Sequence, residues 1–198
     1  MVQLYYCRIP NELNENLISG FSEYRQNKLQ TITSEKARRQ GICAELLLEK
    51  AVEGIYPKPL NIVVNENGKP YFSDRKLFFS ISHSDEYIAC AVYEKEIGLD
   101  IQTRVKYNPK LAQRFFKNDE ILYIQHFKDC DRAFTEIWCK KESRLKALGH
   151  GLKGGLNSFS TLENPAQWIS GDLDSVHYAV CIPGCNEFEI ELREIKLL

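Results

Sequence analysis

The chain carries two kinds of hydrophobic pattern, one repeating every two residues and one repeating every three to four. The period-two stretches predict strands at residues 3–9, 60–64, 78–82, 87–93, 97–102, 176–182 and 188–195. The longer period predicts helices at residues 13–24, 34–52, 111–125 and 132–148. Strands and helices follow one another without low-complexity linkers, so the pattern predicts an α+β fold.

Length and charge limit the classes of function. A chain of 198 residues can bury a substantial core in one domain or in two small ones. Its 26 basic and 27 acidic residues nearly cancel, which disfavours non-specific binding to nucleic acid. The sequence has no apolar run of about eighteen residues, the length that predicts a membrane span. We therefore expect neither nucleic acid nor a membrane as a partner.

The 7 cysteines indicate a reducing compartment. They form no Cys-x-x-Cys pair, which argues against zinc, and most lie in apolar stretches as small buried residues do. A disulfide framework is disfavoured for the same reason. Arg8 and Pro10 come before any long apolar run, so no secretory signal is expected and we predict a cytoplasmic protein.

The predicted helix 132–148 carries the first candidate chemistry. Trp138, Glu142 and Lys146 recur at i, i+4 and i+8, and Lys141 adjoins them. A carboxylate that can hold a divalent cation, one turn from a lysine that can hold phosphate, suits the transfer of a phosphate-linked group. The alternative is a solvated Glu–Lys pair on an exposed helix face.

Two predicted strands carry further candidates. Strand alternation points Asp100 and Gln102 to the same side, and an Asp within a strand needs a reason such as a turn or a cation. The alternative for Asp100 is a cap at the strand end. His83 closes the strand from residue 78 with Ser82 and Ser84 beside it, and the alternative for His83 is a structural role.

Taken in this order, the segments resemble the Sfp-type 4′-phosphopantetheinyl transferases. The matching blocks are Gly68-Lys69-Pro70, the stretch Phe78 to Ser84, Gly98-Leu99-Asp100-Ile101-Gln102, Trp138 to Lys146, Gly149-His150-Gly151-Leu152, and Phe159. They cover roughly half of the chain. The sequence departs from the pattern at Gln102, where many members of the family carry a second strand carboxylate.

The resemblance implies a reaction and a set of site residues. The family transfers the phosphopantetheine arm of coenzyme A to a serine of an acyl or peptidyl carrier protein, leaving adenosine 3′,5′-bisphosphate. The implied cofactor is Mg²⁺, held by Asp100 and Glu142, with Gln102 beside them. The implied catalytic residues are Glu142, Lys146 and His83, and Glu142 also takes the proton of the carrier serine. The implied coenzyme contacts are Arg38, Arg39, Lys69, Pro70, Ser82, His83, Lys141 and Lys146.

Two basic clusters are candidate binding surfaces. Lys36, Arg38 and Arg39 lie at the start of the predicted helix 34–52, where a helix N-terminus also favours phosphate. The family has a basic cluster there for the 3′-phosphate of the coenzyme, and either Arg38 or Arg39 matches it; the alternative is a solvated basic turn. The second cluster is interleaved with Leu111, Phe115 and Phe116 and suits an acidic carrier; its members are Lys106, Lys110, Arg114 and Lys117.

The resemblance also implies two similar α+β lobes in a pseudo-twofold arrangement, with the active site in the cleft between them. We divide the chain into residues 1–98, with the 3′-phosphate and adenosine contacts, and residues 99–198, with the metal ligands and the pyrophosphate lysine. We expect a monomer. Two other functions compete with the transferase: a coenzyme A or nucleotide-binding protein without transferase activity, which Gln102 favours, and a metal-dependent phosphohydrolase, which usually has more carboxylate and histidine ligands.

Overall fold

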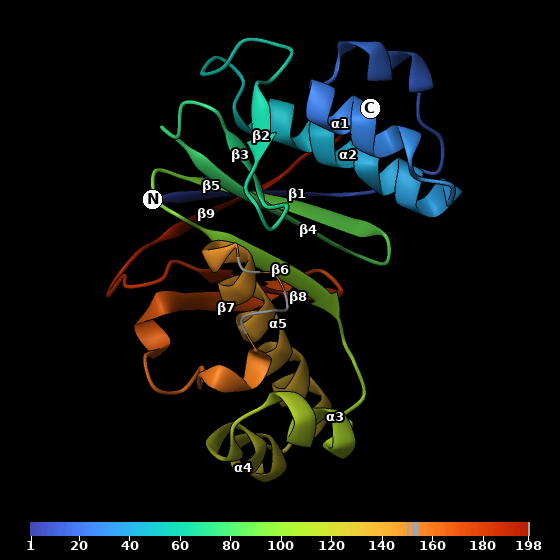
Figure 1. Cartoon of the computed structure of the whole chain (residues 1–198). Helices are drawn as coiled ribbons and strands as arrows, with labels where there is room; N and C mark the ends of the chain where they lie inside the picture. The colour runs from blue at the N-terminus through green and yellow to red at the C-terminus, as the bar shows by residue number, and fades with distance from the viewer. Residues whose placement is uncertain (150, 152–154, 198) are drawn as a thin grey trace.

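Two β-sheets, one built mainly from each half of the chain, lie next to each other in the computed structural model (Figure 1), which describes residues 1–149, 151 and 155–197. The first sheet has the order β4–β5–β1–β9, formed by β4 (Phe78–Ser84), β5 (Tyr87–Tyr93), β1 (Val2–Arg8) and β9 (Ile190–Glu194). The second has the order β6–β8–β7, formed by β6 (Gly98–Thr103), β8 (Val176–Cys181) and β7 (Trp168–Leu173). The predicted α+β class is confirmed.

Helix α2 (Glu35–Ala51) covers the first sheet, and α1 (Glu23–Gln30) packs against α2. Ser34 starts α2 by accepting a hydrogen bond from Ala37 N, and the apolar face of α2 packs on β5 and β1. The predicted helix 13–24 was wrong, because Phe21 is extended there. It separates a 3₁₀ helix (Glu15–Gly20) from α1, whose first turn is capped by Ser22.

Helix α5 (Cys130–Leu148) lies across the second sheet and contacts β6 most. A glycine makes this close approach possible, because a Cβ at Gly98 would lie 1.8 Å from the carbonyl oxygen of Ser143. The apolar side of the same strand points the other way, where Ile97, Leu99 and Ile101 are buried against the first sheet. Gly98 therefore brings the polar face of β6, with Asp100, against α5.

The lower end of the molecule in Figure 1 holds α3 (Pro109–Phe115) and α4 (Asn118–His126), which the sequence predicted as one helix. The backbone is extended at Phe116, whose ring is buried against Phe134 of α5, and Glu120 then caps the new helix by accepting from Lys117 N. Two more 3₁₀ helices, Leu156–Ser158 and Pro165–Gln167, follow α5.

Three serines of β4 join the two sheets. Ser80 Oγ accepts from Leu99 N at 2.9 Å, Ser84 Oγ accepts from Thr103 N at 2.9 Å, and Ser82 lies between them. The two halves are also joined at the C-terminus, since β9 returns to the first sheet and pairs in parallel with β1. The predicted boundary between residues 98 and 99 stays a prediction, and residues 190–194 lie in the sheet of the first half.

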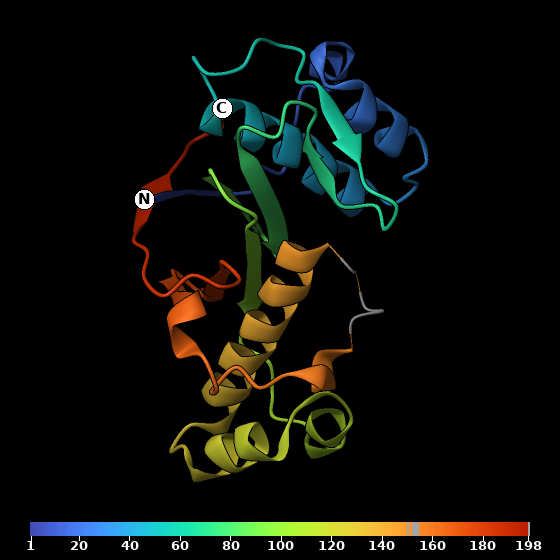
Figure 2. The same ribbon diagram turned by 60° about the vertical axis from the view of Figure 1, so that its left-hand side comes forward.

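A short antiparallel hairpin of β2 (Ile62–Val64) and β3 (Pro70–Phe72) stands beside α1 and reaches towards the end of α5 (Figure 2). Within the part of the chain that the structure describes, no helix is both long enough and apolar enough to cross a bilayer.

Candidate active site

A cleft of about 590 Å³ is lined by β4, between α1 and α2 on one side and α5 on the other. This volume is in the range of cofactor and substrate sites. Its lining comes from α1, α2, the β2–β3 hairpin, β4 and α5, and the polar residues that matter below are Lys28, Lys69, His83, Glu142 and Lys146. The cleft thus collects residues from both halves of the chain.

Lys146, Asp100 and Ser82 form a closed triangle of hydrogen bonds at one wall of the cleft. Lys146 Nζ lies 2.7 Å from Asp100 Oδ1 and 2.8 Å from Ser82 Oγ, and Ser82 donates to the same Asp100 oxygen at 2.8 Å. Asp100 and Ser82 are buried, whereas the Lys146 side chain is 33% exposed. The Lys146 ammonium group therefore faces the cleft, and its hydrogen bonds to the buried Asp100 and Ser82 fix its orientation.

Glu142 lies one turn before Lys146 and lines the same cleft. Partial burial raises the pKa of Glu142, the nearby charge of Asp100 raises it further, and Lys146 opposes both effects. The ion pair that Lys146 forms is with Asp100, so the alternative of a solvated Glu142–Lys146 pair does not describe this helix.

The two carboxylates suit a hard cation. Asp100 acts on the pKa of Glu142, so a cation near both would relieve an existing repulsion. Mg²⁺ is usually held by only one or two carboxylates together with substrate phosphates and water. Among residues 1–149, 151 and 155–197, no group of three or more His, Cys, Asp or Glu side chains forms a ready-made metal site. Gln102 lies two residues after Asp100 on β6 and is partly buried.

His83 and Lys28 also line the cleft. His83 follows Ser82 on β4 but points to the opposite face, towards α1 and α2. The surrounding protein atoms lower the pKa of His83, and the charges of Lys146 and Lys28 lower it further. Sequence reasoning missed Lys28, and its only signal was the i, i+4 spacing from Tyr24 on α1, which also lines the cleft.

Comparison with known proteins places the chain in a family. The family model of the 4′-phosphopantetheinyl transferase superfamily matches residues 96–181, a range that holds Asp100, Glu142 and Lys146. The chain is 30% identical over 178 residues to the 4′-phosphopantetheinyl transferase gsp of Aneurinibacillus migulanus, covering 85% of this chain and 75% of that protein. The chain belongs to this superfamily. It is therefore a transferase, as the sequence predicted.

Two Bacillus subtilis relatives support the same assignment. One 4′-phosphopantetheinyl transferase is 29% identical over 169 residues, covering 82% of this chain and 75% of the relative. The 4′-phosphopantetheinyl transferase Sfp of strain 168 is 27% identical over 176 residues, covering 85% of this chain and 78% of the relative. The phosphopantetheinyl transferase resemblance is thus confirmed along most of the chain.

The transferase cleft does not receive every residue that the resemblance implied. Arg38 pairs with Glu15 and donates to Leu29 O, and Arg39 donates to Asn11 O. Arg39 lines a second cavity of about 460 Å³, separated from the cleft by Gln40, which lines both. The structure therefore does not bring either arginine to the cleft.

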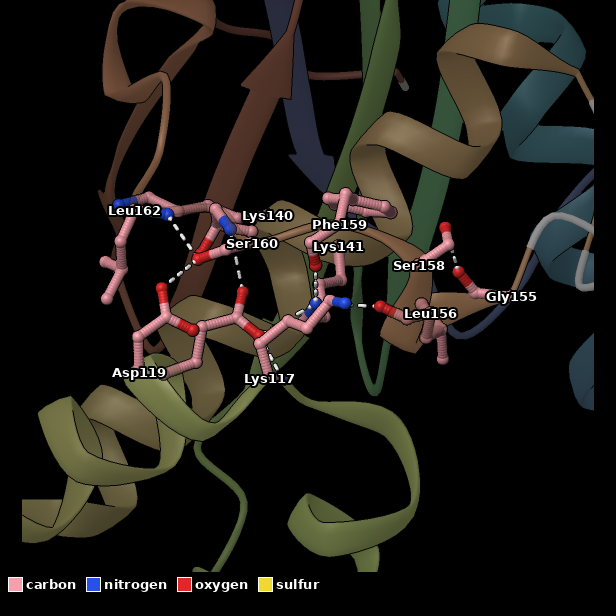
Figure 3. A network of polar contacts seen from close by, with 12 residues as sticks. Lys117, Asp119, Lys140, Lys141, Gly155, Leu156, Ser158, Phe159, Ser160 and Leu162 are labelled. Carbon is pink, nitrogen blue, oxygen red and sulfur yellow. Dashed lines mark hydrogen bonds and ion pairs between the residues drawn. The ribbon is translucent and has the colours of Figure 1, made fainter.

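Lys141 also lies elsewhere, which corrects its assignment as a coenzyme contact. Its side chain is fully buried, and its Nζ atom lies 2.7 Å from Leu156 O, 2.7 Å from Phe159 O and 2.8 Å from Glu120 Oε2 (Figure 3). Burial lowers the pKa of Lys141, and Glu120 opposes this. All three ammonium hydrogens have partners there, so Lys141 is part of the structural framework.

Trp138 is likewise a core residue, packed against Phe115, Phe116 and Phe134. Phe159, from the last matching block, lies over the Lys141 ammonium and stacks near Trp168. Gly149 and Gly151 line the cleft, whereas His150 and Leu152 of the same block lie outside the described residues. All seven cysteines lie in described parts of the chain, and none forms a disulfide.

Proposed function

We propose that the protein transfers the 4′-phosphopantetheine arm of coenzyme A to a serine of an acyl or peptidyl carrier protein. The observation that carries the proposal is the distribution of charge along one cleft. Lys146 stands beside Asp100 and Glu142, and Lys28 and His83 line the same cleft. Coenzyme A has a pyrophosphate and a separate 3′-phosphate, and two ammonium groups with an imidazole in one cleft offer hydrogen-bond donors to both.

Lys146 would bind the pyrophosphate, because its ammonium faces the cleft and is held in place by Ser82 and Asp100. His83 and Lys28 would bind the 3′-phosphate. Asp100 and Glu142, with Gln102 nearby, would hold Mg²⁺, whose charge would offset the negative charge that develops on the leaving group. Pro70 and the backbone of Lys69 would lie against the adenosine end, since both residues line the cleft.

The transfer step needs a base for the carrier serine. The serine oxygen attacks the phosphorus that bears pantetheine, a new P–O bond forms, and the bond to the bridging pyrophosphate oxygen breaks, releasing adenosine 3′,5′-bisphosphate. Glu142 takes the serine proton. Its raised pKa supports this role, because a carboxylate whose pKa lies closer to neutral pH accepts a proton more readily.

The carrier would approach over α3 and the start of α4. The cluster predicted there is exposed, and its members are Lys106, Lys110, Arg114 and Lys117. Carrier proteins present an acidic helix beside their serine, so this surface offers complementary charge. The proposal keeps the expectation of a monomeric, cytoplasmic enzyme, which size-exclusion chromatography and cell fractionation test.

The decisive experiment is intact-mass analysis of an apo-carrier incubated with coenzyme A, Mg²⁺ and the protein. The carrier should gain the mass of one phosphopantetheine arm, and a carrier with its target serine replaced by alanine should gain none. Lys146→Ala should lose the reaction, whereas Lys140→Ala on the same helix, whose ammonium pairs with Glu136, should keep it. Coenzyme A binding without any mass gain on a panel of carriers would support the alternative of a binding protein without transferase activity.

A further inference from the structure

The Lys69 side chain connects the β2–β3 hairpin to the end of α5. Its Nζ atom lies 2.6 Å from Ala147 O, in the last turn of α5, and 2.5 Å from Glu96 Oε2. The side chain is 14% exposed, whereas that of Glu96 is 54% exposed. Figure 2 shows the loop of the hairpin beside the upper end of α5.

These contacts engage the Lys69 ammonium. Carbonyl groups in the last turn of a helix have no partner within the helix, and a lysine that donates to one of them also meets the negative end of the helix dipole. The positive charge of Lys69 is therefore neutralised within the protein by Glu96.

A second contact brings the same two elements together. Asn65 Oδ1 accepts from Lys69 N at 2.9 Å, and Asn65 Nδ2 donates to Gly149 O at 3.4 Å. Gly149 has a φ of 65°, and a Cβ there would lie 2.9 Å from both Lys69 Cδ and Asn65 Nδ2. Only glycine fits this approach without strain. The hairpin and the helix end are thus packed closely around Lys69.

The two joined elements form facing parts of the cleft wall. Gly68, Lys69 and Pro70 line it from the hairpin, and Glu142, Leu145 and Lys146 line it from α5. We propose that Lys69 is a positioning residue whose ammonium ties the hairpin to α5, so that the backbone of residues 68–70 is held where the adenosine end of the coenzyme binds. This inference rests on the proposed function.

The test compares Lys69→Met, Glu96→Gln and the double variant by calorimetric titration with coenzyme A. Lys69→Met should weaken binding by about tenfold, since it removes charge-assisted hydrogen bonds that hold the hairpin. Glu96→Gln should weaken it by about threefold, because Ala147 O still holds the lysine, and the double variant should be no weaker than Lys69→Met. If Lys69 instead bound a phosphate directly, Glu96→Gln would leave binding unchanged or strengthen it, and that result would overturn the inference.

A kinetic readout separates positioning from chemistry. In the transfer assay, Lys69→Met should raise the KM for coenzyme A and leave kcat and the KM for the carrier close to those of the unaltered protein. Lys69→Arg keeps a cation that can reach both partners and should restore most of the affinity. A fall in kcat at an unchanged KM for coenzyme A would contradict the positioning role.

Hydrogen exchange tests the connection without coenzyme. Amides of residues 65–70 should exchange faster in Lys69→Met than in the unaltered protein, whereas those of β5 should not change. If the amides of residues 65–70 exchanged equally fast in Lys69→Met and in the unaltered protein, the inference would be overturned, even if the unaltered protein is an active transferase. The proposed function fails by a different result, namely an unaltered protein that neither binds coenzyme A nor modifies a carrier.

Discussion

Glu142 must be charged to accept a proton, but its partial burial disfavours the charged form. Its pKa is raised by burial and by Asp100, so the folded state binds the proton more tightly than the unfolded state does. The stabilisation from this proton is complete below the unfolded pKa of about 4.3 and is lost as the pH rises through the folded pKa. The charged Glu142 carboxylate is therefore disfavoured in the folded, ligand-free protein.

Replacement of Glu142 by Gln should consequently stabilise the ligand-free protein at pH 7 while abolishing transfer. Urea denaturation should show a higher free energy of unfolding for Glu142→Gln at pH 7, and the gain should disappear at about pH 3, where the carboxyl is protonated in both states. Glu136→Gln on the same helix serves as the control. A variant that is less stable at pH 7 would show that Glu142 is not held in an unfavourable environment.

Gln102 gives a second prediction at the level of one side chain. Its amide offers a cation at most a neutral oxygen, whereas a carboxylate there would add a formal charge next to Asp100. Gln102→Glu should lower the Mg²⁺ concentration for half-maximal activity, because hard cations bind charged oxygen ligands more tightly. Gln102→Ala should cost far less activity than Asp100→Ala. An unchanged Mg²⁺ requirement in Gln102→Glu would place this side chain away from the metal.

The spacing of residues predicted part of the site and missed the rest for physical reasons. Alternation along β6 gave the inward direction of Asp100, and helical spacing put Glu142 and Lys146 on one face, where both line the cleft. The same spacing predicted that Lys141 lies beside them. In the structure its ammonium is enclosed by Glu120 and two carbonyl groups, and this depends on tertiary packing that the spacing does not reveal. Lys28 belongs to no motif, since it reaches the cleft only because α1 packs against α2 and the β2–β3 hairpin.

Two faces of helix α5 therefore have different surroundings. Glu142 and Lys146 line the cleft, whereas Lys141 forms a buried ion pair. Lys141→Met should lower the free energy of unfolding by roughly 3–5 kcal/mol, because it leaves the buried Glu120 carboxylate without a counter-charge. Lys141→Met combined with Glu120→Gln should lose less. Denaturation curves give both values, and coenzyme A affinity at a temperature where the variant is folded should be unchanged. If Lys141→Met weakened coenzyme binding and kept normal stability, Lys141 would instead be a coenzyme contact.

Element boundaries were harder to predict than element types. The apolar spacing of residues 111–125 fits one helix, but burial of Phe116 against Phe134 is incompatible with a continuous helix there, and Glu120 offers a new cap. Similarly, Ser22 starts a new helix inside the stretch predicted as 13–24. In both places a local capping side chain together with one buried ring outweighs the periodic pattern.

The break between α3 and α4 places two basic residues of the proposed carrier surface on separate elements, Arg114 in α3 and Lys117 at the start of α4. Arg114→Glu and Lys117→Glu should each raise the KM for the carrier by about three- to tenfold, more at low salt than at high salt, and leave the KM for coenzyme A nearly unchanged. Lys76→Glu, an exposed reversal in the turn after β3, should change neither constant. Equal rises for both substrates would show that this cluster is not a carrier surface.

At the scale of the whole molecule, the cleft depends on how firmly the two halves are joined. The serine contacts from β4 to β6 set Ser82 beside Asp100, and β9 carries the chain back to the first sheet. After β9, Ile195 and Leu197 accordingly pack against the core cluster that α2 shares with the first sheet. A division between residues 98 and 99 would leave β1 without the strand that covers one of its edges, so we expect the halves to be coupled in folding.

Removal of the residues after Glu189 tests this coupling. The shortened chain loses the pairing of β9 with β1 and the partly buried side chains Ile190, Ile195 and Leu197. It should lose roughly 3 kcal/mol of unfolding free energy, at about 1 kcal/mol for each half-buried aliphatic side chain. Hydrogen exchange should show the amides of β1 losing protection, whereas Leu192→Ser, at an exposed position of β9, should change stability little. If β1 kept its protection in the shortened chain, residues 1–98 would fold independently of the C-terminal strand, and the predicted boundary would gain direct support.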